Sequence, residues 1–226
     1  MNGIIIINKP KNITSNQTIQ KIKAHFKIKK IGHCGTLDPL ASGILLACIG
    51  KATKISQELI TKNKRYLVEG IIGIKSETND IDGKIKIIIK DLKTKIKNII
   101  KNKLNLIKAE QFQYPSSYSA IKHKGLQLYK YARKGINIIK TKRPANIYKI
   151  KLLKLTNINI ILDITCSKGI YIREILNNLS KKTSVPLCVS MIHRLSIDKY
   201  KIINSYSLNY ILNIKDKNTF LSILIK

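Results

Sequence analysis

Hydrophobic and polar residues along this 226-residue chain are arranged in patterns that predict both strands and helices. Short runs of isoleucine, leucine and valine have the length of buried strands, whereas stretches with apolar residues three or four positions apart have the period of helices. Strands are predicted over residues 3–8, 43–50, 65–73, 84–90, 145–155, 158–167 and 186–197. Because these elements follow no regular βαβ rhythm, we expect an α+β fold with a mostly antiparallel mixed sheet flanked by helices and loops.

The first predicted helix lies in the segment TSNQTIQKIKAHF. Its apolar residues Ile19, Ile22 and Phe26 have helical spacing, and they follow two N-cap candidates, Ser15 and Asn16. Further helices are expected from residue 51, over 91–100 with Asp91 as the cap, over 126–135 up to Gly135, over 171–179 and, weakly, over 205–226.

The composition favours a globular protein with a polyanionic partner. At 44% hydrophobic residues the chain can bury a core, which excludes global disorder. The formal net charge of +31 makes nucleic acid the first candidate partner, although base-composition bias in the source genome would also enrich lysine. With no signal peptide or membrane-length apolar run, we expect a cytoplasmic protein that does not contact a membrane.

Rare residue types are more informative than the abundant lysines. The cysteines have neither metal-ligand spacing nor the pattern of a disulfide framework. A planar guanidinium cannot be replaced by an ammonium group where a carboxylate or phosphate must be held in fixed geometry. We therefore give special weight to the five arginines, which are Arg65, Arg133, Arg143, Arg173 and Arg194.

A glycine-rich loop before the strand at 43–50 contains a single acid, Asp38. The following proline disfavours the helical region for Asp38, and Gly32, Gly35 and Gly43 are expected to be flexible points around it. Two interpretations stay open on local physics. Asp-Pro often forms only a turn, or the loop presents a carboxylate at the edge of a sheet.

Three other positions are candidates for a site, and each also has an ordinary structural explanation. Tyr66 begins a predicted strand, while Tyr171 and Arg173 begin a predicted helix. Tyr66 is equally compatible with an aromatic residue at the rim of the fold, and Arg173 with an ordinary surface residue. Their spacing in the sequence does not show that they lie in one site. We interpret the NDIDG segment as a turn, because it lacks the later ligands of a calcium loop. Lys9-Pro10 is interpreted as a brace for the Asp38 loop.

Five segments, in order, carry a family resemblance. They are INKPKNITSN, GHCGTLDPLASGILLACIGKATK, KRYLVEGIIGIKSETNDIDG, YPSSYSAIKHKGLQLYKYARKGI and CSKGIYIREI. Together they resemble the motifs of the bacterial tRNA pseudouridine-55 synthases, the TruB-type family. One such motif would be weak evidence, but five in the same order cover most of the chain.

The resemblance implies an isomerase that converts uridine to pseudouridine in the T loop of tRNA, without a metal, a cofactor or an obligatory protein partner. Asp38 matches the catalytic aspartate, which attacks either C6 of the uracil or C1′ of the ribose. Arg173 matches the partner of that aspartate. Tyr66 matches the tyrosine that stacks on the target base and is a candidate for proton removal at C5. His33 matches the histidine that enters the RNA loop, and Tyr171 and Ile192 match further positions of the pocket.

The resemblance also implies a domain organisation. We expect a catalytic domain over residues 1–204, an RNA-binding insertion at 114–143 and a short helical tail at 205–226, without the further C-terminal RNA-binding domain usual in the family. Within the insertion, the candidate RNA contacts are Tyr118, Lys122, Tyr129 and Arg133.

The sequence departs from the family pattern at three places. Asn12 replaces a glycine, Cys34 replaces a threonine or serine, and His193 replaces an arginine. Asparagine is one of the few residues that tolerate a left-handed conformation, so we expect the turn at Asn12 to be kept.

Two rival functions fit parts of the sequence. A non-catalytic tRNA-binding or tRNA-folding factor would need the basic surface and the insertion, but not Asp38, Tyr66 and Arg173 together. A metal-dependent nuclease would use Asp38 with Asp80 and Asp82.

Overall fold

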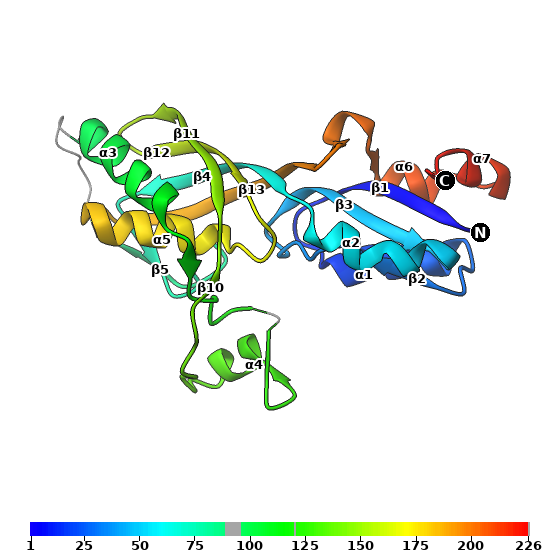
Figure 1. Ribbon diagram of the computed structural model, residues 1–226, viewed down its shortest axis with the longest axis horizontal. Coiled ribbons are helices and arrows are strands. Elements are labelled where there is room, and N and C mark those ends of the chain that lie inside the picture. Colours follow the sequence, from blue (N-terminus) through cyan, green and yellow to red (C-terminus); the bar gives the residue numbers. More distant parts are fainter. Residues whose placement is uncertain (89–95, 120, 226) are drawn as a thin grey trace. The chain divides into compact units, whose positions relative to one another are not determined.

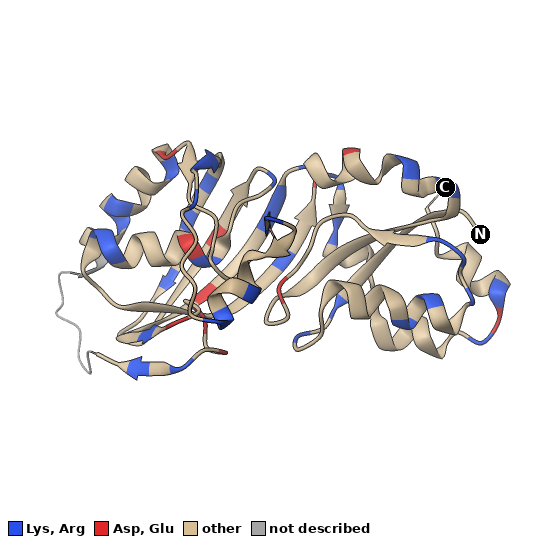
Figure 2. Cartoon of the chain, turned by 90° about the horizontal axis from the view of Figure 1, so that it is seen from below, with Lys and Arg blue, Asp and Glu red and all other residues tan. Residues whose placement is uncertain are grey.

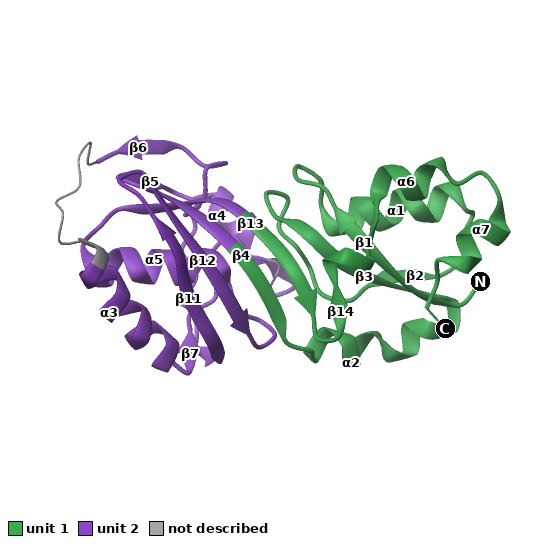
Figure 3. Cartoon of the chain, turned by 90° about the horizontal axis from the view of Figure 1, so that it is seen from above, with its two compact units in different colours: residues 1–67, 192–226 green, residues 68–191 purple. Residues whose placement is uncertain are grey.

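The computed structural model describes residues 1–88, 96–119 and 121–225. The chain divides into two compact units, with residues 1–67 and 192–226 in unit 1 and residues 68–191 in unit 2 (Figure 3). The chain passes between the units within strands β4 (Lys64–Ile72) and β13 (Leu187–Ile197). Each unit therefore contains part of the same two strands.

Strand β1 (Gly3–Lys9) lies between β3 (Ser42–Ile49) and β15 (Tyr206–Ser207) in the sheet of unit 1. It pairs antiparallel with β3 and parallel with β15. β3 also pairs antiparallel with β2 (Ile31–His33) and parallel with β13. The Asp38 loop thus connects two neighbouring strands, β2 and β3.

The isoleucine run of β1 is buried on both faces of the sheet. Ile5 and Ile7 belong to one hydrophobic cluster, and Ile4 and Ile6 belong to the other. A strand covered on both faces is expected to be continuously apolar, which explains why the run showed no alternation. The first cluster is completed by side chains from α1 (Ser15–His25), α6 (Leu208–Asn213) and α7 (Lys217–Ser222).

The N-cap of α1 differs from the prediction. Thr14, rather than Ser15 or Asn16, caps the helix: its side chain accepts a hydrogen bond from the Gln17 amide at 3.0 Å, and the Gln17 side chain accepts one from the Thr14 amide at 3.0 Å. This reciprocal arrangement requires Gln three residues after Thr. As a result, the hydroxyl of Ser15 is available for a partner outside the helix.

The part of the nine-stranded sheet that belongs to unit 2 has the strand order β11 (Ile147–Leu155), β12 (Asn159–Cys166), β4 and β13. Helices α3 (Ile96–Ala109) and α5 (Ile172–Thr183) pack beside each other (Figure 1). Asp91, the expected cap of α3, lies outside the described residues.

The rest of unit 2 consists of small hairpins and the insertion. Of the strand predicted at 84–90, β6 (Ile85–Ile87) is formed and pairs with β5 (Ile74–Ser76), while residues 89 and 90 are not described. The insertion begins after β7 (Phe112–Gln113) and ends at its partner β10 (Arg143–Pro144). Within it lie the paired strands β8 (Lys122–His123) and β9 (Leu126–Gln127), and helix α4 (Leu128–Arg133).

The predicted fold class is confirmed, since the sheet pairs are mixed and mostly antiparallel, with helices flanking them. The helix expected from residue 51 starts as a 3-10 helix (Gly50–Ile55) and continues as α2 (Ser56–Thr61). Short elements complete the chain: β14 (Tyr200–Lys201), which pairs with β13, and a 3-10 turn (Ile202–Asn204).

Basic residues are spread over the elements of both units rather than gathered on one (Figure 2). Among the helices that the structure describes, none has the length and apolar character needed to span a bilayer.

We predict that Gly43→Ala lowers the free energy of unfolding by about 3 kcal/mol or more. Gly43 has φ +100°, and a Cβ there would lie 2.3 Å from the carbonyl oxygen of Arg194 on the neighbouring strand. Urea denaturation measures the change. Gly32→Ala is the control, because a Cβ at Gly32 meets no atom within 4 Å among the described residues. An equal loss in both variants would contradict the prediction.

Candidate active site

The loop of residues 35–39, which carries Asp38, is held by hydrogen bonds to every one of its main-chain carbonyls. The donors come from distant parts of unit 1 and, for Asp38, from a residue just after the loop. They are Arg194 for Gly35 and Thr36, Ser15 for Leu37, the Ala41 amide for Asp38, and the Asn12 amide and Lys9 for Pro39. The peptide groups of the loop are therefore fixed, and Asp38 itself is only half-buried.

Arg194 holds the start of the loop from strand β13. Its side chain is 1% exposed, and Nε donates to the carbonyl of Ile44 at 2.7 Å. Nη2 donates to the carbonyl of Gly35 at 3.3 Å, and Nη1 to that of Thr36 at 3.4 Å. Donors on three nitrogens of one rigid plane are available only in arginine. Of the five arginines singled out in the sequence, Arg173 and Arg194 are the buried ones.

Ser15 holds the residue before Asp38. Its buried hydroxyl accepts a hydrogen bond from the Leu37 amide at 2.8 Å and donates one to the Leu37 carbonyl at 3.0 Å. One small side chain thus satisfies both main-chain groups of Leu37. Sequence reasoning missed this role because it assigned Ser15 to the helix cap.

Lys9 and Asn12 hold the end of the loop, which confirms the interpretation of Lys9-Pro10 as a brace. The Lys9 ammonium group is fully buried and donates to the carbonyls of Pro10 and Ile13 at 2.7 Å and of Pro39 at 3.4 Å. Asn12 has φ 63°, the left-handed conformation expected of it. Its amide donates to the carbonyl of Pro39 at 2.8 Å.

The environment of Lys9 lowers its pKa from 10.5 to about 8. Burial is the main cause, and the positive charge of Arg194 acts in the same direction, while the negative charge of Asp38 opposes them. The three charges therefore interact within unit 1.

Two of the three glycines expected to give the loop its flexibility have unusual backbone conformations. Gly35 has φ +97° and Gly43 has φ +100°, both in a region that favours glycine. Gly32 lies within strand β2 without a positive φ, so its backbone conformation does not require glycine.

The other candidates in unit 1 lie on strands. Tyr66, on β4, is 8% exposed, and Ile192, on β13, is buried. His33 ends β2, and burial together with the nearby Arg194 charge lowers its pKa. Its imidazole is therefore neutral at neutral pH, and its buried Nδ1 has no hydrogen-bond partner among the described residues.

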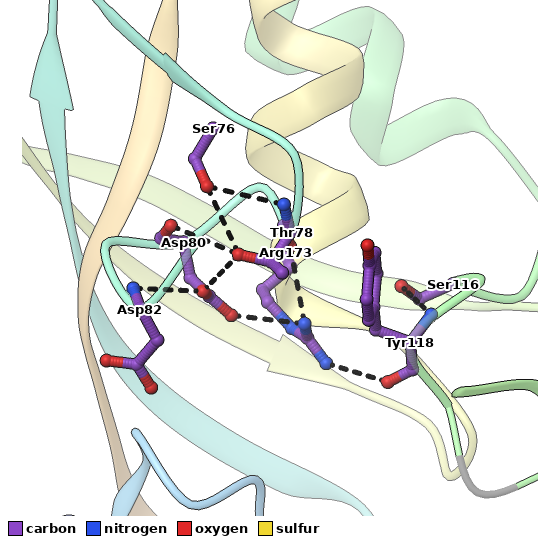
Figure 4. Close-up of polar contacts among 7 residues, drawn as sticks. All are labelled: Ser76, Thr78, Asp80, Asp82, Ser116, Tyr118 and Arg173. Carbon is purple, nitrogen blue, oxygen red and sulfur yellow. Dashed lines mark hydrogen bonds and ion pairs between the residues drawn. The ribbon is translucent and has the colours of Figure 1, made fainter. Parts of the chain in front are cut away.

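Arg173 lies in unit 2, in the first turn of α5, and is buried in a polar cluster (Figure 4). Its Nη1 forms an ion pair with Asp80 at 3.1 Å and donates to the Thr78 carbonyl at 3.3 Å. Nη2 donates to the carbonyl of Tyr118 at 3.2 Å. Removing one partner of a buried ion pair usually costs about 3–5 kcal/mol, so Asp80 and Arg173 each depend on the other.

Asp80 was considered only as a metal ligand of the rival nuclease, and its pairing with Arg173 was missed because NDIDG was interpreted as a turn. The segment is a turn, and it is stabilised by Asp80 Oδ1, which accepts hydrogen bonds from the Thr78 hydroxyl at 2.6 Å and the Asp82 amide at 3.2 Å. The other carboxylate oxygen binds Arg173. The signal was present, since this acid occupies the aspartate position of one of the five motifs.

Tyr171 is the N-cap residue of α5. The side-chain amide of Gln113 forms two hydrogen bonds with its main chain: Nε2 donates to the carbonyl at 3.0 Å and Oε1 accepts from the amide at 2.8 Å. Gln113 belongs to the base of the insertion, so this contact joins the insertion to the segment of Tyr171 and Arg173.

The insertion places aromatic and basic side chains together, as the sequence suggested. The guanidinium carbon of Arg133 lies 5.4 Å from the ring centre of Tyr129, and Lys142 Nζ lies 5.3 Å from that of Tyr114. Such pairs stiffen long basic side chains while leaving their remaining donors for a ligand. Lys122 is exposed on β8.

The candidate residues are thus divided between the units. Asp38, Tyr66, His33 and Ile192 belong to unit 1, and Tyr171 and Arg173 belong to unit 2. Over the described part of the chain, no group of three or more His, Cys, Asp or Glu side chains is arranged to hold a metal ion.

Comparison with known proteins shows which family the sequence matches. The family profile described as "TruB family pseudouridylate synthase (N terminal domain)" matches residues 23–172. A tRNA pseudouridine synthase B of Idiomarina loihiensis is 40% identical over 197 residues, which cover 86% of this chain and 62% of that protein. The enzyme of the same name from Blochmanniella pennsylvanica is 41% identical over 200 residues, covering 88% and 76% of the two chains. The chain thus spans less than two thirds of the Idiomarina relative.

Solved structures support the fold. One match is a chain in the crystal structure of a Cbf5-Nop10-Gar1 complex, with a TM-score of 0.72 and 22% sequence identity. The match covers 98% of this chain and 59% of that chain. A chain of the archaeal box H/ACA sRNP Nop10-Cbf5 complex matches 93% of this one with a TM-score of 0.68 and 19% identity, over 52% of its own length.

We predict that Ser15→Ala lowers the free energy of unfolding by about 1–3 kcal/mol, because it leaves two main-chain groups of Leu37 without their partner. Chemical denaturation measures the loss. Thr18→Val is the matched control, since the buried Thr18 hydroxyl donates to the Thr14 carbonyl within its own helix. If both variants lose the same stability, Ser15 does no more than an ordinary buried hydroxyl.

The lowered pKa of Lys9 predicts a pH dependence of stability. Between about pH 8 and 10.5 the unfolded chain retains the Lys9 proton that the folded chain has lost, so the free energy of unfolding rises with pH across this window. Subtracting the values for Lys9→Met isolates the effect from other lysines. If the difference in free energy of unfolding between the wild type and Lys9→Met does not change from pH 8 to 10.5, the prediction is contradicted.

Proposed function

The chain belongs to the TruB family of pseudouridylate synthases, and from this premise we propose that it is a tRNA pseudouridine-55 synthase acting on the T loop. The observation that carries the proposal is the loop of residues 35–39, whose carbonyls are all hydrogen-bonded around the one acid that matches the family's nucleophile. Fixing a nucleophile before the substrate arrives lowers the entropic part of a reaction barrier.

The proposed reaction is an isomerisation in which Asp38 is the nucleophile. Its carboxylate attacks C6 of the uracil or C1′ of the ribose, and the bond between N1 and C1′ breaks. The base rotates and C5 bonds to C1′, and the bond between Asp38 and C6 or C1′ breaks, which frees the carboxylate. The C5 proton leaves and N1 gains a proton. Atoms and charge balance without an oxidant, a metal or an energy source.

The remaining side chains have complementary proposed roles. Tyr66 stacks on the flipped base and receives the C5 proton, and Tyr171 and Ile192 form the walls of the pocket. Arg173 acts as the cationic partner of Asp38, and its ion pair with Asp80 supports this role because it keeps the guanidinium buried and oriented.

His33 is proposed to enter the RNA loop in the space left by the target nucleotide. Its lowered pKa supports insertion of a neutral ring among stacked bases. Extruding a base costs a few kcal/mol, and stacking on one aromatic ring returns about 1–3 kcal/mol. Stacking on Tyr66 and insertion of His33 together would therefore provide about enough free energy to offset the cost of extruding the base.

The proposed partner is the T arm of tRNA, bound through the basic surface and through Tyr118, Lys122, Tyr129 and Arg133 of the insertion. Exposed bases of a loop are commonly recognised by aromatic rings and arginine planes. A tRNA-modifying enzyme of this kind would work in the cytoplasm.

The proposal is tested with a T-arm stem-loop carrying tritium at C5 of its uridines, in the presence of EDTA. We expect the wild-type protein to release tritium and Asp38→Asn to release none while still binding the RNA. Asp198→Asn is the matched control, because it removes the same charge from an exposed position of unit 1. Release by Asp38→Asn would contradict the enzyme proposal. Tight binding without release by the wild type would favour a tRNA-folding factor, and RNA cleavage a nuclease.

A further inference from the structure

Gln113 connects two parts of unit 2 that have different proposed tasks. It ends β7, whose pairing with β10 closes the base of the insertion, and its register partner is Arg143. Its side-chain amide binds both the carbonyl and the amide of Tyr171, 58 residues away in the chain. A planar amide offers a donor and an acceptor side by side, so it pairs with the N–H and C=O of one residue as a neighbouring strand would.

The segment that Gln113 holds leads directly into the proposed catalytic machinery. Tyr171 has φ −95° and ψ 106°, the extended conformation of an N-cap, and Arg173 follows two residues later. Arg173 in turn donates to the carbonyl of Tyr118 within the insertion (Figure 4). The insertion therefore holds this segment at two points, through Gln113 at its base and through Tyr118 further along.

The rest of the insertion stands away from the body of unit 2, with α4 well separated from α5 and the sheet (Figure 1). It carries the Tyr129–Arg133 pair on α4. The insertion is covalently connected to the rest of unit 2 through β7 and β10. A force that a bound RNA applies to the insertion therefore passes through these two strands. Gln113 lies at this junction.

We propose that Gln113 is a positioning residue that couples RNA contact at the insertion to the placement of Tyr171 and Arg173. The inference rests on the proposed function. RNA binding fixes the insertion, the Gln113 amide transmits that constraint to the Tyr171 peptide, and the first turn of α5 is held in the geometry that turnover requires. Gln113 therefore affects turnover more strongly than RNA affinity.

The test compares Gln113→Met, which keeps the length of the side chain but removes both hydrogen bonds, with Gln113→Glu, which keeps only the acceptor. We expect kcat at saturating stem-loop RNA to fall at least tenfold for Met and less for Glu, with Kd changed less than twofold. Gln111→Met is the control, because the exposed Gln111 lies two residues earlier on the same segment and uses its main-chain carbonyl to bind the Ala145 amide.

Hydrogen–deuterium exchange of residues 168–176 provides a second readout. RNA should slow exchange in this segment of the wild type and of Gln111→Met, but not of Gln113→Met. An unchanged kcat in both Gln113 variants, or losses of kcat, affinity and thermal stability in parallel, would overturn the coupling. If the wild type binds RNA without isomerising uridine, the proposed function fails and the exchange experiment alone decides the coupling. Should Gln113→Met not fold, Gln113→Glu carries both readouts.

Discussion

Peptide groups that pack against a sheet need hydrogen-bond partners, and in unit 1 this requirement organises the elements around residues 35–39. Residues 35–39 form neither a helix nor a strand, so their carbonyls take donors from elsewhere. Helix α1 supplies Ser15, strand β13 supplies Arg194, and the end of β1 supplies Lys9. Displacing any of these elements would leave a main-chain group unpaired, at a cost of about 1–3 kcal/mol. The conformation of the loop and the placement of α1, β13 and β1 therefore stabilise each other.

The need to pair buried main-chain carbonyls also accounts for where the interior of the protein has lysine and where it has arginine. Lysines cover both units, and the buried cations that hold main-chain carbonyls are Lys9, Lys64, Arg173 and Arg194. Lys9 meets carbonyls that converge on one point, whereas each arginine meets acceptors spread around a plane. This difference explains why the arginines persist in a chain so rich in lysine. The two buried arginines serve the Asp38 loop in unit 1 and the start of α5 in unit 2.

Local patterns in the sequence predicted what local physics determines. The isoleucine run predicted β1 and the helical spacing of Ile19 and Ile22 predicted α1. Two of the glycines expected to be flexible points, Gly35 and Gly43, have a positive φ. The partners of the site were not predictable in this way. Ser15 meets Leu37 across 22 residues, Gln113 meets Tyr171 across 58, and Asp80 meets Arg173 across 93. Each of these polar residues also fits an ordinary cap or turn, and only the tertiary structure shows which partner it has.

The family resemblance supplied the identity of the candidate residues, and the structure supplied a physical reason for some of them. Asp38 stands in a loop whose main chain is fixed, and Arg173 stands in a buried cluster with Asp80. Cys34, which departs from the family pattern, is buried with its sulfur 3.3 Å from that of Cys48. The substitution is accommodated because a thiol has about the size of a hydroxyl-bearing side chain and fits an apolar core.

In the proposed mechanism, a fixed loop aims Asp38 at a flipped uridine. A crystal structure of Asp38→Asn bound to a T-arm stem-loop tests this, through the distances from the side chain of residue 38 to C6 and C1′ of the target uridine. We expect an extruded uridine with one of these carbons about 3–3.5 Å from that side chain and with the hydrogen bonds of residues 35–39 unchanged. A uridine still stacked within the RNA loop, or one bound far from residue 38, would contradict it.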